Sequence, residues 1–234
     1  MTIRLLIHGA AGRMGHALLR LAAYDTRFAI AGVVTRTGGA VEGLRALTPD
    51  RIAEAIPFDV LVDFSLPGAF DGALEICLQR GIAFVSGTTG LSNAQRAALD
   101  VASKSIPVLW AANFSMGVAI LDDLVRRAAA ALPEWDCDIV EMHHADKRDA
   151  PSGTALTLGE TIATARGARP HYASLRAGDI VGEHSVQFTG AGERLELIHR
   201  ATNRDIFARG ALEAAARIAG RGPGRYALGE LLLG

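Results

Sequence analysis

The sequence is poor in cysteine, in net charge and in long apolar runs, and each shortage excludes a class of protein. Two cysteines in 234 residues cannot build a disulfide framework, so Cys77 and Cys137 are expected as buried thiols in a reducing compartment. The formal net charge is only −1, whereas domains that bind nucleic acid usually carry a strong basic excess. No apolar run approaches the ~18–20 residues that a membrane span needs. We therefore expect neither nucleic acid nor a membrane as a partner.

Metal-ligand and targeting patterns are missing as well. The seven histidines form no H-E-x-x-H motif and no Cys/His ligand set, so no metal site is expected. A strand pattern begins directly after Met1 and Thr2, which leaves no room for a signal or transit peptide. Together with the two cysteines, this predicts a cytoplasmic protein.

The chain does contain enough apolar sequence for a sizeable core, because half of its residues are hydrophobic. In its first half, short β-branched strand patterns alternate with helical patterns, which predicts an α/β fold with a doubly wound parallel sheet. The expected strands are Ile3–His8, Phe28–Val34, Val60–Phe64, Ala83–Ser86 and Pro107–Trp110, and the expected helices are Arg13–Ala23, Ala69–Gln79 and Asn93–Lys104.

The pattern changes after Asn113 and predicts a second, smaller α+β domain. Two alternating segments separated by Gly190-Ala191-Gly192 indicate an antiparallel hairpin. A helical period returns near the end of the chain, before an apolar tail. The expected elements are a helix over Met116–Ala131, a strand over Ile139–His144, a helix over Ser152–Ala165, strands over His184–Thr189 and Arg194–Ala201, a helix over Asp205–Ala219 and the tail Leu228–Leu233.

Three glycines, Gly9, Gly12 and Gly15, follow the first expected strand and open the first expected helix. In that context a glycine pattern is a dinucleotide-binding fingerprint, and the sheet is then of the Rossmann type. Gly9 permits a tight turn, Gly12 permits close approach of a pyrophosphate, and Gly15 permits close packing of the helix. The spacing is G-x-x-G-x-x-G instead of the commoner G-x-G-x-x-G, and a plain tight turn is the alternative.

The segment Glu141–Ala155, E-M-H-H-A-D-K-R-D-A-P-S-G-T-A, concentrates chemistry in fifteen consecutive residues. Imidazole and ammonium groups both hold and deliver protons, and a helix N-terminus rich in Ser, Gly and Thr can hold an anion. The segment therefore offers a proton donor, a cation and a carboxylate cradle. Taken singly, adjacent histidines are more often structural than catalytic, and Ser-Gly-Thr is a routine helix cap.

This segment closely resembles the signature of the 4-hydroxy-tetrahydrodipicolinate reductase family, long called the dihydrodipicolinate reductase family. Further blocks resemble the same family in the same order and extend the resemblance over nearly the whole chain. They are H-G-A-A-G-R-M-G (8–15), V-S-G-T-T-G (85–90), W-A-A-N-F-S-M-G-V (110–118), R-A-G-D-I-V-G-E-H (176–184) and G-E-R-L-E-L-I-H-R-A (192–201).

The resemblance implies a reductive reaction on a small-molecule cyclic dicarboxylate in lysine and diaminopimelate biosynthesis. Hydride passes from a nicotinamide to the substrate, water is lost and tetrahydrodipicolinate results. His143 corresponds to the family's proposed acid, and Lys147 corresponds to its catalytic lysine, either as a proton source or as a carboxylate partner. His144 is implied as a substrate contact, which requires the strand to end there. Gly153 and Thr154 are implied to bind the second carboxylate at the helix N-terminus.

The resemblance also implies the cofactor residues and the domain limits. Residues 1–114 and 204–234 are expected to bind the dinucleotide, and residues 115–203 to bind substrate and form the oligomer. The implied cofactor contacts are Gly9, Ala10, Ala11, Gly12, Arg13, Met14, Thr35, Arg36, Gly87, Thr88, Thr89, Ala111, Ala112, Asn113, Phe114, Arg204 and Phe207. For Phe114 and Phe207, packing in a core or hinge is an equally good interpretation.

The end of the second expected strand bears on the choice of dinucleotide. An acidic residue there would bind the adenosine ribose and repel a 2′-phosphate. The family commonly has an acid followed by Arg, but here Thr35 replaces the acid, Arg36 remains, and no carboxylate follows before Glu42. We therefore expect NADPH to be preferred, with NADH possible. The alternative is that Arg36 is only a solvated loop charge.

Two segments are shorter than is usual in the family, after the second strand and between Arg166 and Arg176. The second carries subunit contacts in many members, so a homo-oligomer is expected as a dimer or a loosely held tetramer, with Leu156–Leu158 and the hairpin as other pairing surfaces. Two other functions stay open: an imine or amino-acid reductase such as aspartate dehydrogenase, and a nucleotide-binding module without catalysis.

Overall fold

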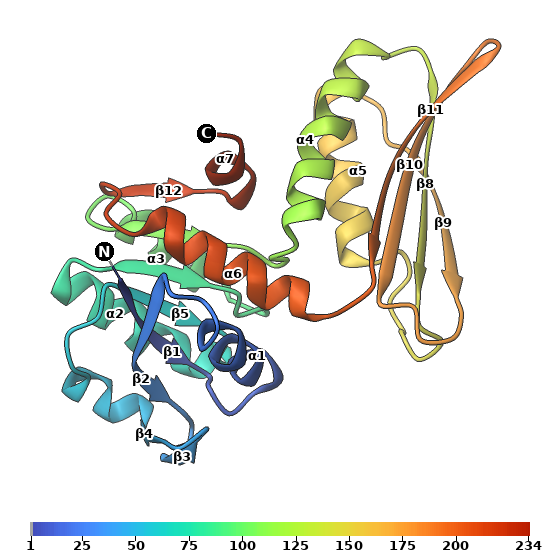
Figure 1. The fold of residues 1–234 in the computed structure, drawn as a ribbon. Coiled ribbons are helices and arrows are strands. Elements are labelled where there is room, and N and C mark those ends of the chain that lie inside the picture. Colours follow the sequence, from blue (N-terminus) through green and yellow to red (C-terminus); the bar gives the residue numbers. More distant parts are fainter. Residues whose placement is uncertain (1) are drawn as a thin grey trace. The chain divides into compact units, whose positions relative to one another are not determined.

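The computed structural model describes residues 2–234, which divide into two compact units (Figure 1). The first unit runs to Phe114 and resumes at Phe207, and the second unit spans Ser115–Ile206. The sequence placed the return to the first unit at Arg204, slightly before the position in the structure. Each unit has its own sheet and its own hydrophobic core.

The first unit is built on an eight-stranded sheet with the order β12-β7-β6-β5-β1-β2-β4-β3. The five strands that the sequence predicts for this unit pair in parallel, which confirms the α/β fold with a doubly wound parallel sheet. They are β1 (Ile3–His8), β2 (Phe28–Val34), β5 (Val60–Asp63), β6 (Ala83–Ser86) and β7 (Pro107–Trp110). Three short strands were not predicted: β3 (Gly39–Val41), β4 (Leu44–Leu47) and β12 (Gly224–Tyr226).

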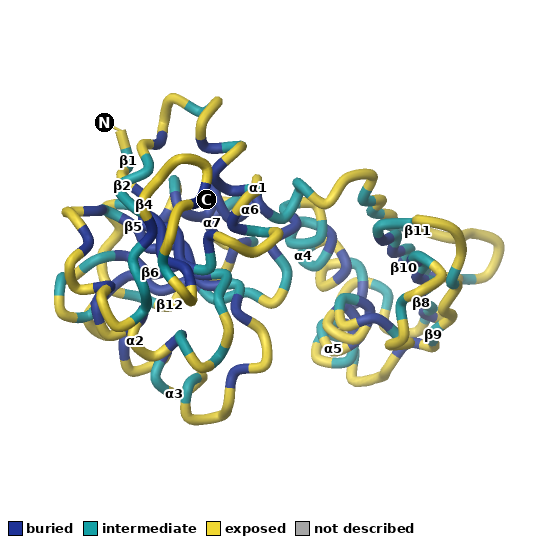
Figure 2. The backbone as a smooth tube through the Cα atoms, turned by 90° about the horizontal axis from the view of Figure 1, so that it is seen from below, coloured by how far each residue is buried: buried dark blue, intermediate teal, exposed yellow. Residues whose placement is uncertain are grey.

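Helices cover the faces of this sheet, so β5 and β6 are buried along their whole length and are apolar except for Asp63 and Ser86 at their carboxyl ends. Figure 2 shows the buried residues concentrated in these central strands. One core joins Leu6, Leu61 and Phe84 of the strands to Phe70 and Leu99 of two helices. The helical elements are α1 (Arg13–Ala22), η1 (Pro49–Glu54), α2 (Pro67–Arg80), α3 (Asn93–Ala102), α6 (Asp205–Ile218) and α7 (Leu228–Leu233).

The strand order of the first unit reverses at β1. The chain passes from β1 to β2 on one side and later places β5 on the other side of β1. Ligands of open α/β sheets bind outside the carboxyl ends of the strands at such a switch point. The turn that follows β1 begins with Gly9, and the turn that follows β5 begins with Phe64. These two turns therefore lie where a dinucleotide is expected.

The second unit is a four-stranded sheet, β11-β10-β8-β9, with two helices on one face (Figure 1). The hairpin of β10 and β11 is antiparallel, as predicted, and β8 also pairs antiparallel with β10. Strand β9 pairs parallel with β8 and lies in the short connection that the sequence did not predict to be a strand. The elements are α4 (Met116–Ala131), β8 (Asp136–His143), α5 (Gly153–Arg166), β9 (His171–Arg176), β10 (Gly182–Gly190) and β11 (Glu193–Ala201).

Buried and less buried residues alternate along β8 and β10, and the buried ones are the side chains that face the helices. On β10, His184, Val186 and Phe188 are buried, and their neighbours are only partly buried. The apolar members of this face pack with Leu121 and Val125 of α4 and with residues of α5 in one core. Two inward-facing positions of β8, however, hold Glu141 and His143. No helix in the described part of the chain is long and apolar enough to cross a membrane.

Candidate active site

His143 is the last residue of β8, and its side chain is buried beside a carboxylate. Its Nδ1 atom lies 2.5 Å from Oε2 of Glu141, two residues earlier on the same face of the strand. Burial lowers the pKa of the His143 imidazole, the Glu141 carboxylate acts upward, and the charges of Lys147 and Arg176 lower it further, so the net shift of the pKa is downward. Because β8 ends at His143, His144 lies outside the strand, which the predicted contact of His144 with substrate requires.

Glu141 is fully buried and is the most strongly bonded carboxylate of the second unit. Its two oxygens receive hydrogen bonds from the Arg176 guanidinium at 2.7 and 3.0 Å, and Oε1 also accepts the backbone N–H of Ser152 at 3.3 Å. Burial alone would raise the pKa of the Glu141 carboxyl. Hydrogen bonds from Arg176, Ser174 and His143 outweigh burial and lower that pKa to about 2. Glu141 is therefore an anion at neutral pH.

Arg176, at the end of β9, binds more than Glu141. Its Nε donates to the backbone oxygen of Lys147 at 3.3 Å, and Nη2 donates to the backbone oxygen of Asp149 at 2.6 Å. Its Nη1 also donates to the backbone oxygen of Leu175 at 2.7 Å. One guanidinium thus holds both the carboxylate behind His143 and the loop that carries Lys147.

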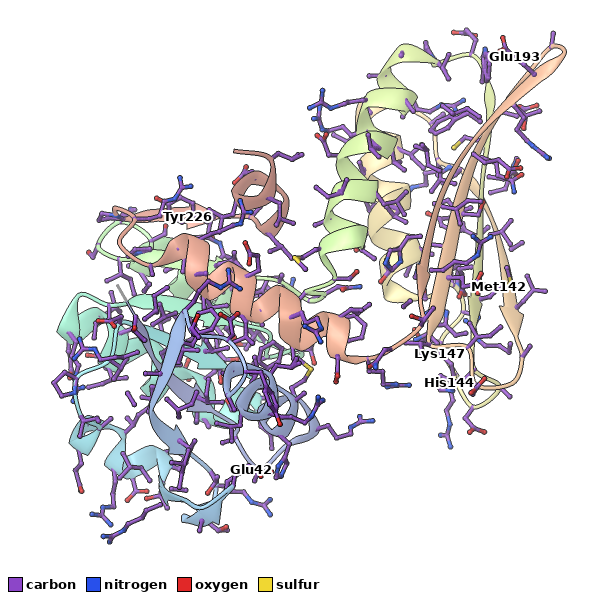
Figure 3. The ribbon with its side chains drawn as sticks, in the orientation of Figure 1. Glu42, Met142, His144, Lys147, Glu193 and Tyr226 are labelled. Atoms are coloured by element: carbon purple, nitrogen blue, oxygen red, sulfur yellow. The ribbon has the colours of Figure 1, made fainter. Side chains whose placement is uncertain are left out.

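Lys147 lies on the loop that leads from β8 to α5, where Figure 3 also places His144. Its Nζ donates to Asp149 Oδ1 at 2.7 Å, and its side chain is about one-fifth exposed, at 22%. The ammonium group is thus already hydrogen-bonded to a carboxylate oxygen. The same group can bind a carboxylate of a ligand in place of Asp149.

The loop ends at Ser152, which is the N-cap of α5. Ser152 Oγ accepts the backbone N–H of Ala155, and it also lies 3.2 Å from Nε2 of His184 on β10. Gly153 is exposed at the first position of the helix and Thr154 follows it. An exposed helix N-terminus presents backbone N–H groups to an anion. The structure therefore brings His143, His144, Lys147, Gly153 and Thr154 to one loop and its two ends.

His184 is the neighbour of His143 across the sheet. The two rings meet edge to face, with centroids 5.3 Å apart. Burial, and next to it the neighbouring His143 and His199, lower the pKa of His184 to about 4. His184 is therefore neutral near pH 7, and the described surroundings of His143 contain one anion, Glu141, among cationic or neutral groups.

The glycine turn of the first unit has the geometry that a dinucleotide cradle requires. Gly9 has φ +81°, and a Cβ atom there would lie 2.3 Å from the backbone oxygen of Phe64. A Cβ atom on Gly15 would lie 2.4 Å from Cα of Ala10, so this glycine permits close packing against the turn. Gly12 caps α1 without any side-chain hydrogen bond, which leaves the helix N-terminus open for an anion. Ala11 and Arg13 are exposed beside it.

Thr35 and Arg36 follow β2 but differ in accessibility. Thr35 is buried, and its hydroxyl donates to the backbone oxygen of Gly38 at 2.8 Å, so it stabilises the turn. Arg36 is exposed. The first carboxylate after the strand, Glu42, lies 2.8 Å from Nδ1 of His16 on α1, a contact that no local sequence pattern predicts.

A buried carboxylate, Asp63, organises the carboxyl ends of β5 and β6. Its Oδ2 accepts hydrogen bonds from the hydroxyls of Ser86 and Thr88, both at 2.8 Å, and its Oδ1 lies 3.0 Å from Nδ1 of His8. The Thr88 hydroxyl is therefore engaged inside the protein, whereas Thr89 is exposed. Thr88, which was predicted to contact the cofactor, therefore stabilises the turn through its hydroxyl group.

The remaining predicted cofactor residues lie in α1, after β6, after β7, or at the start of α6 and just before it. Phe114 is buried, and its ring packs against that of Phe64 with centroids 5.3 Å apart, which favours the packing interpretation for Phe114. Ala111 N–H donates to the backbone oxygen of Ser86. The others are Met14, Gly87, Ala112, Asn113, Phe207 and Arg204, of which Ala112 and Arg204 are exposed.

Four polar residues of the candidate site were not singled out from the sequence: Glu141, Arg176, Ser152 and His184. For Glu141 a signal was available, because a residue two positions before His143 shares its face of a strand. For Ser152 the N-cap position was also visible. Arg176 and His184 come from strands distant in sequence, and only the pairing of β8 with β9 and β10 reveals them.

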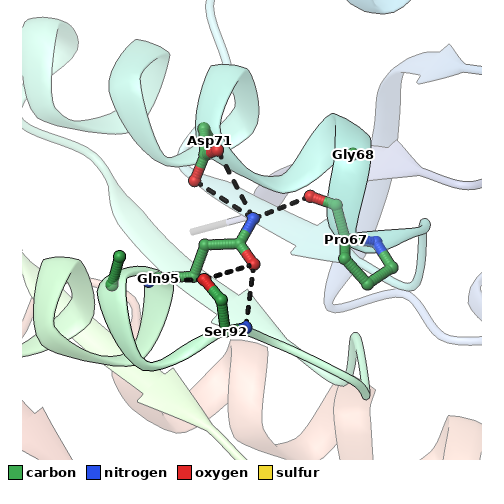
Figure 4. Close-up of a pocket in the computed structure, with 6 residues that line it drawn as sticks. Pro67, Gly68, Asp71, Ser92 and Gln95 are labelled. Atoms are coloured by element: carbon green, nitrogen blue, oxygen red, sulfur yellow. Dashed lines mark hydrogen bonds between the residues drawn. The ribbon is translucent and has the colours of Figure 1, made fainter.

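The first unit also has a pocket away from the predicted contacts. It lies between the N-termini of α2 and α3 and is crossed by the Gln95 side chain, which donates to the backbone oxygen of Pro67 and to Asp71 (Figure 4). Ser92 and Gln95 form the capping box of α3. Within residues 2–234, no three His, Cys, Asp or Glu side chains are grouped as a metal site.

Comparison with known proteins gives consistent results. The family model described as "Dihydrodipicolinate reductase, N-terminus" matches residues 3–114, and the one described as "Dihydrodipicolinate reductase, C-terminus" matches residues 117–232. The 4-hydroxy-tetrahydrodipicolinate reductase of Stenotrophomonas maltophilia (strain R551-3) is 61% identical over 234 residues, with 98% of both chains covered. The protein of the same name from Xanthomonas campestris pv. campestris (strain B100) is 59% identical, covering 99% of this chain and 98% of the relative.

Among solved structures, the dipicolinate-bound dihydrodipicolinate reductase from Paenisporosarcina sp. TG-14 shares the fold. Its TM-score is 0.84 at 23% sequence identity, and the match covers 97% of this chain and 98% of that chain.

Proposed function

Because the chain belongs to the dihydrodipicolinate reductase family, we propose that it reduces 4-hydroxy-tetrahydrodipicolinate with NADPH as the preferred hydride donor, and that His143 and Lys147 perform the proton transfer and carboxylate binding. Enzymes of this family are oxidoreductases that use a nicotinamide cofactor in lysine biosynthesis. The observation that carries the proposal is the loop between β8 and α5, where an imidazole, an ammonium group and a helix N-terminus occur together.

The substrate is a dianion, and the second unit offers two distinct places for its carboxylates. Lys147 is already bonded to the carboxylate of Asp149, and a substrate carboxylate can replace that partner. The second carboxylate is proposed to bind at the N-terminus of α5, at Gly153 and Thr154, with His144 beside it. A dianion bound there would raise the pKa of His143, whose free-enzyme pKa is lowered by burial.

The cofactor is proposed to bind along the switch point of the first unit. The glycine turn from Gly9 fits a pyrophosphate, since Gly9 adopts the positive φ of a tight turn packed against the backbone of Phe64 and Gly12 leaves the helix N-terminus uncapped. Arg36 is exposed at the end of β2, where a 2′-phosphate would lie, and Thr35 adds no negative charge. Both features support NADPH over NADH.

In the proposed reaction, the 4-hydroxyl group of the substrate leaves as water, bound NADPH supplies the hydride, and the protein supplies orientation and a proton. Negative charge builds on the substrate as hydride arrives. His143, in its protonated form, neutralises that charge by donating a proton. Lys147 holds a carboxylate and is the second candidate for the donor.

A coupled assay tests the proposal. Freshly generated 4-hydroxy-tetrahydrodipicolinate is supplied with NADPH or NADH, and oxidation of the cofactor is followed by its absorbance. We expect turnover with both cofactors and a higher kcat/KM with NADPH. Oxaloacetate with ammonia is the control substrate for cofactor oxidation, and L-aspartate with NADP⁺ or NAD⁺ is the control in the reverse direction; neither should give turnover. NADPH binding without turnover of any substrate would identify a binding module and contradict the proposal.

We also propose that the protein assembles as a homo-oligomer through the outer face of the second sheet, and that it is cytoplasmic. Strand register places Val140, Ser185 and Ile198 side by side on the face opposite the helices. Ile198 is 43% exposed and Leu175 is 47% exposed on the same face. Leu158, expected from the sequence as a pairing residue, is instead buried in the core of its own unit.

A further inference from the structure

The Arg176 guanidinium uses every hydrogen-bond donor that it has. An arginine side chain carries five N–H groups in a rigid fork. In Arg176 they reach both oxygens of Glu141 and the backbone oxygens of Lys147, Asp149 and Leu175. The side chain is only 18% exposed, and its carboxylate partner is not exposed at all. A fully satisfied, largely buried fork of this kind fixes the positions of all its acceptors.

Two of these acceptors are directly connected to the groups that are proposed to act on the substrate. Glu141 accepts a hydrogen bond from Nδ1 of His143, and the backbone of Lys147 carries the ammonium group. A carboxylate that accepts Nδ1–H leaves Nε2 as the ring atom that can exchange a proton with a ligand. The Nε2 atom faces Gly182 on β10, where an added Cβ would lie only 3.0 Å away.

The charges around the His143 ring come from four elements. Glu141 on β8 is the anion, Arg176 on β9 and Lys147 on the loop are cations, and His184 on β10 is neutral. Without Glu141, the imidazolium form of His143 would face two cations and no anion. The carboxylate therefore both orients the ring and offsets the repulsion that its protonated form would meet.

We propose that Glu141 and Arg176 are positioning residues for the proton-transfer step. Glu141 fixes the His143 ring with Nδ1–H toward the carboxylate, which leaves Nε2 as the donating atom. Arg176 holds Glu141 in place, and the same guanidinium holds the loop of Lys147. This inference rests on the proposed function for its kinetic consequences, but its structural part concerns the protein alone. Neither residue is assigned any contact with substrate or cofactor.

The decisive variant is Glu141→Gln, which keeps the shape and removes the charge. Oε1 accepts two donors, Nη2 of Arg176 and the backbone N–H of Ser152, whereas Oε2 accepts one from Arg176 Nη1, so the amide oxygen should occupy the Oε1 position and the amide NH₂ group should face Nδ1 of His143. An N–H on Nδ1 is then disfavoured, and the neutral ring should change from the Nδ1–H to the Nε2–H tautomer. Nitrogen-15 NMR of the enzyme with labelled imidazoles measures this change of tautomer at His143, and it requires no substrate.

The kinetic test uses the pH profile of kcat and a double-mutant cycle. In Glu141→Gln we expect kcat to fall about tenfold or more, and its high-pH limb to move to lower pH, because the protonated His143 has lost its anion. In a His143→Gln background the same change should alter kcat less than about twofold, since Glu141 acts only through the ring. Glu183→Gln is the matched control: Glu183 pairs with Arg200 in the same sheet and should change neither tautomer nor profile.

A second variant covers the possibility that Glu141→Gln does not fold. Arg176→Lys keeps one charge but loses the fork, and it should lower kcat while leaving NADPH binding unchanged. Equal losses from Glu141→Gln in the wild-type and His143→Gln backgrounds, or an unmoved pH limb and tautomer, would overturn the inference. A wild-type protein that does not turn over the substrate would instead refute the proposed function, and the NMR measurement would still decide the arrangement of the ring.

Discussion

His184 and His199 lie directly opposite each other on β10 and β11, and the Nε2 atom of each contacts the N-cap serine of a different helix. Their ring centroids are 6.5 Å apart. Ser152, which caps α5, lies 3.2 Å from His184, and Ser115, which caps α4, lies 3.2 Å from His199. Both rings have pKa values lowered by burial, so the pair is neutral in the folded protein near pH 7.

This pair predicts a loss of stability in mild acid. The pKa of His184 falls from its ordinary 6.5 to about 4 in the fold, so the unfolded chain binds this proton more readily. The stabilising contribution is present above about pH 6.5 and is lost as the pH falls toward 4. Urea titrations should show the free energy of unfolding fall by about 2 kcal/mol or more between about pH 7.5 and about pH 5.

Two variants test the origin of that loss. His184→Gln removes the titrating ring and should flatten the pH dependence of unfolding, whatever it does to stability at pH 7.5. His171→Gln is the control, because the His171 side chain is 89% exposed on the neighbouring β9. An unchanged slope in His184→Gln would show that the loss arises from other groups.

Cofactor preference should depend on Arg36. A charge-assisted hydrogen bond is worth about 1.5–3 kcal/mol, so kcat/KM should favour NADPH over NADH by about tenfold to 100-fold. Arg36→Ala should remove most of this preference by weakening NADPH alone. The sequence alone also suggested Thr35→Glu, but Thr35 is buried and bonded to Gly38, so that change would disturb the turn as well.

Arg45→Ala provides the comparison for Arg36→Ala, because Arg45 is an exposed arginine on the nearby strand β4. It should leave the ratio of the two kcat/KM values unchanged. A wild-type enzyme that prefers NADH would contradict the assignment of Arg36 to the 2′-phosphate.

The proton-transfer roles predict a separation of turnover from cofactor binding. His143→Gln and Lys147→Ala should each lower kcat by about 10²-fold or more, as removal of a general acid typically does. NADPH affinity, measured by fluorescence, should barely change, because the proposed dinucleotide contacts lie in the first unit. Lys147→Ala should also raise KM if the ammonium group binds a carboxylate.

Thr154→Val is the milder companion of these variants. It should act chiefly on KM, since a backbone donor at Gly153 survives. Near-normal turnover in both the His143 and Lys147 variants would remove the loop from the chemistry and leave the activity supported by family membership alone.

Assembly should depend on the outer face of the second sheet. Light scattering of the wild-type protein should show a dimer or a tetramer that dissociates on dilution. Ile198→Lys places a charge on that face and should shift the protein to smaller species. Leu124→Lys on α4 is the matched control, because Leu124 is 45% exposed and Ile198 is 43% exposed. A tetramer that persists in Ile198→Lys at nanomolar concentration would assign the contact to another surface.

The sequence predicted the buried elements of the fold better than the exposed ones. Strands such as Ala83–Ser86 and Pro107–Trp110 are largely apolar because both faces of the sheet are covered, and their limits agree with the structure. Strand β9 was missed because four of its six residues are exposed, so no alternation of polar and apolar residues marks it. The short strands β3, β4 and β12 depend on pairing with a neighbour more than on their own composition.

The candidate site was predictable where its residues are adjacent in the chain. His143, Lys147, Gly153 and Thr154 fall within one segment, so their grouping was visible in the sequence. Arg176 became part of the site only through the parallel pairing of β8 with β9, which sets His143 opposite Arg176. Long-range pairing of this kind leaves no local pattern, and a single sequence cannot reveal it.

The alternation along β10 has a consequence for how the second unit folds. His184, Val186 and Phe188 face inward, while Glu183, Ser185 and Gln187 face outward. A hairpin that pairs one residue out of step would turn the polar set toward the helices and the apolar set toward water. A shift by one residue is thus penalised at every position along the strand. The inward face of β10, which contributes His184 to the candidate site, therefore also determines the register in which the sheet assembles.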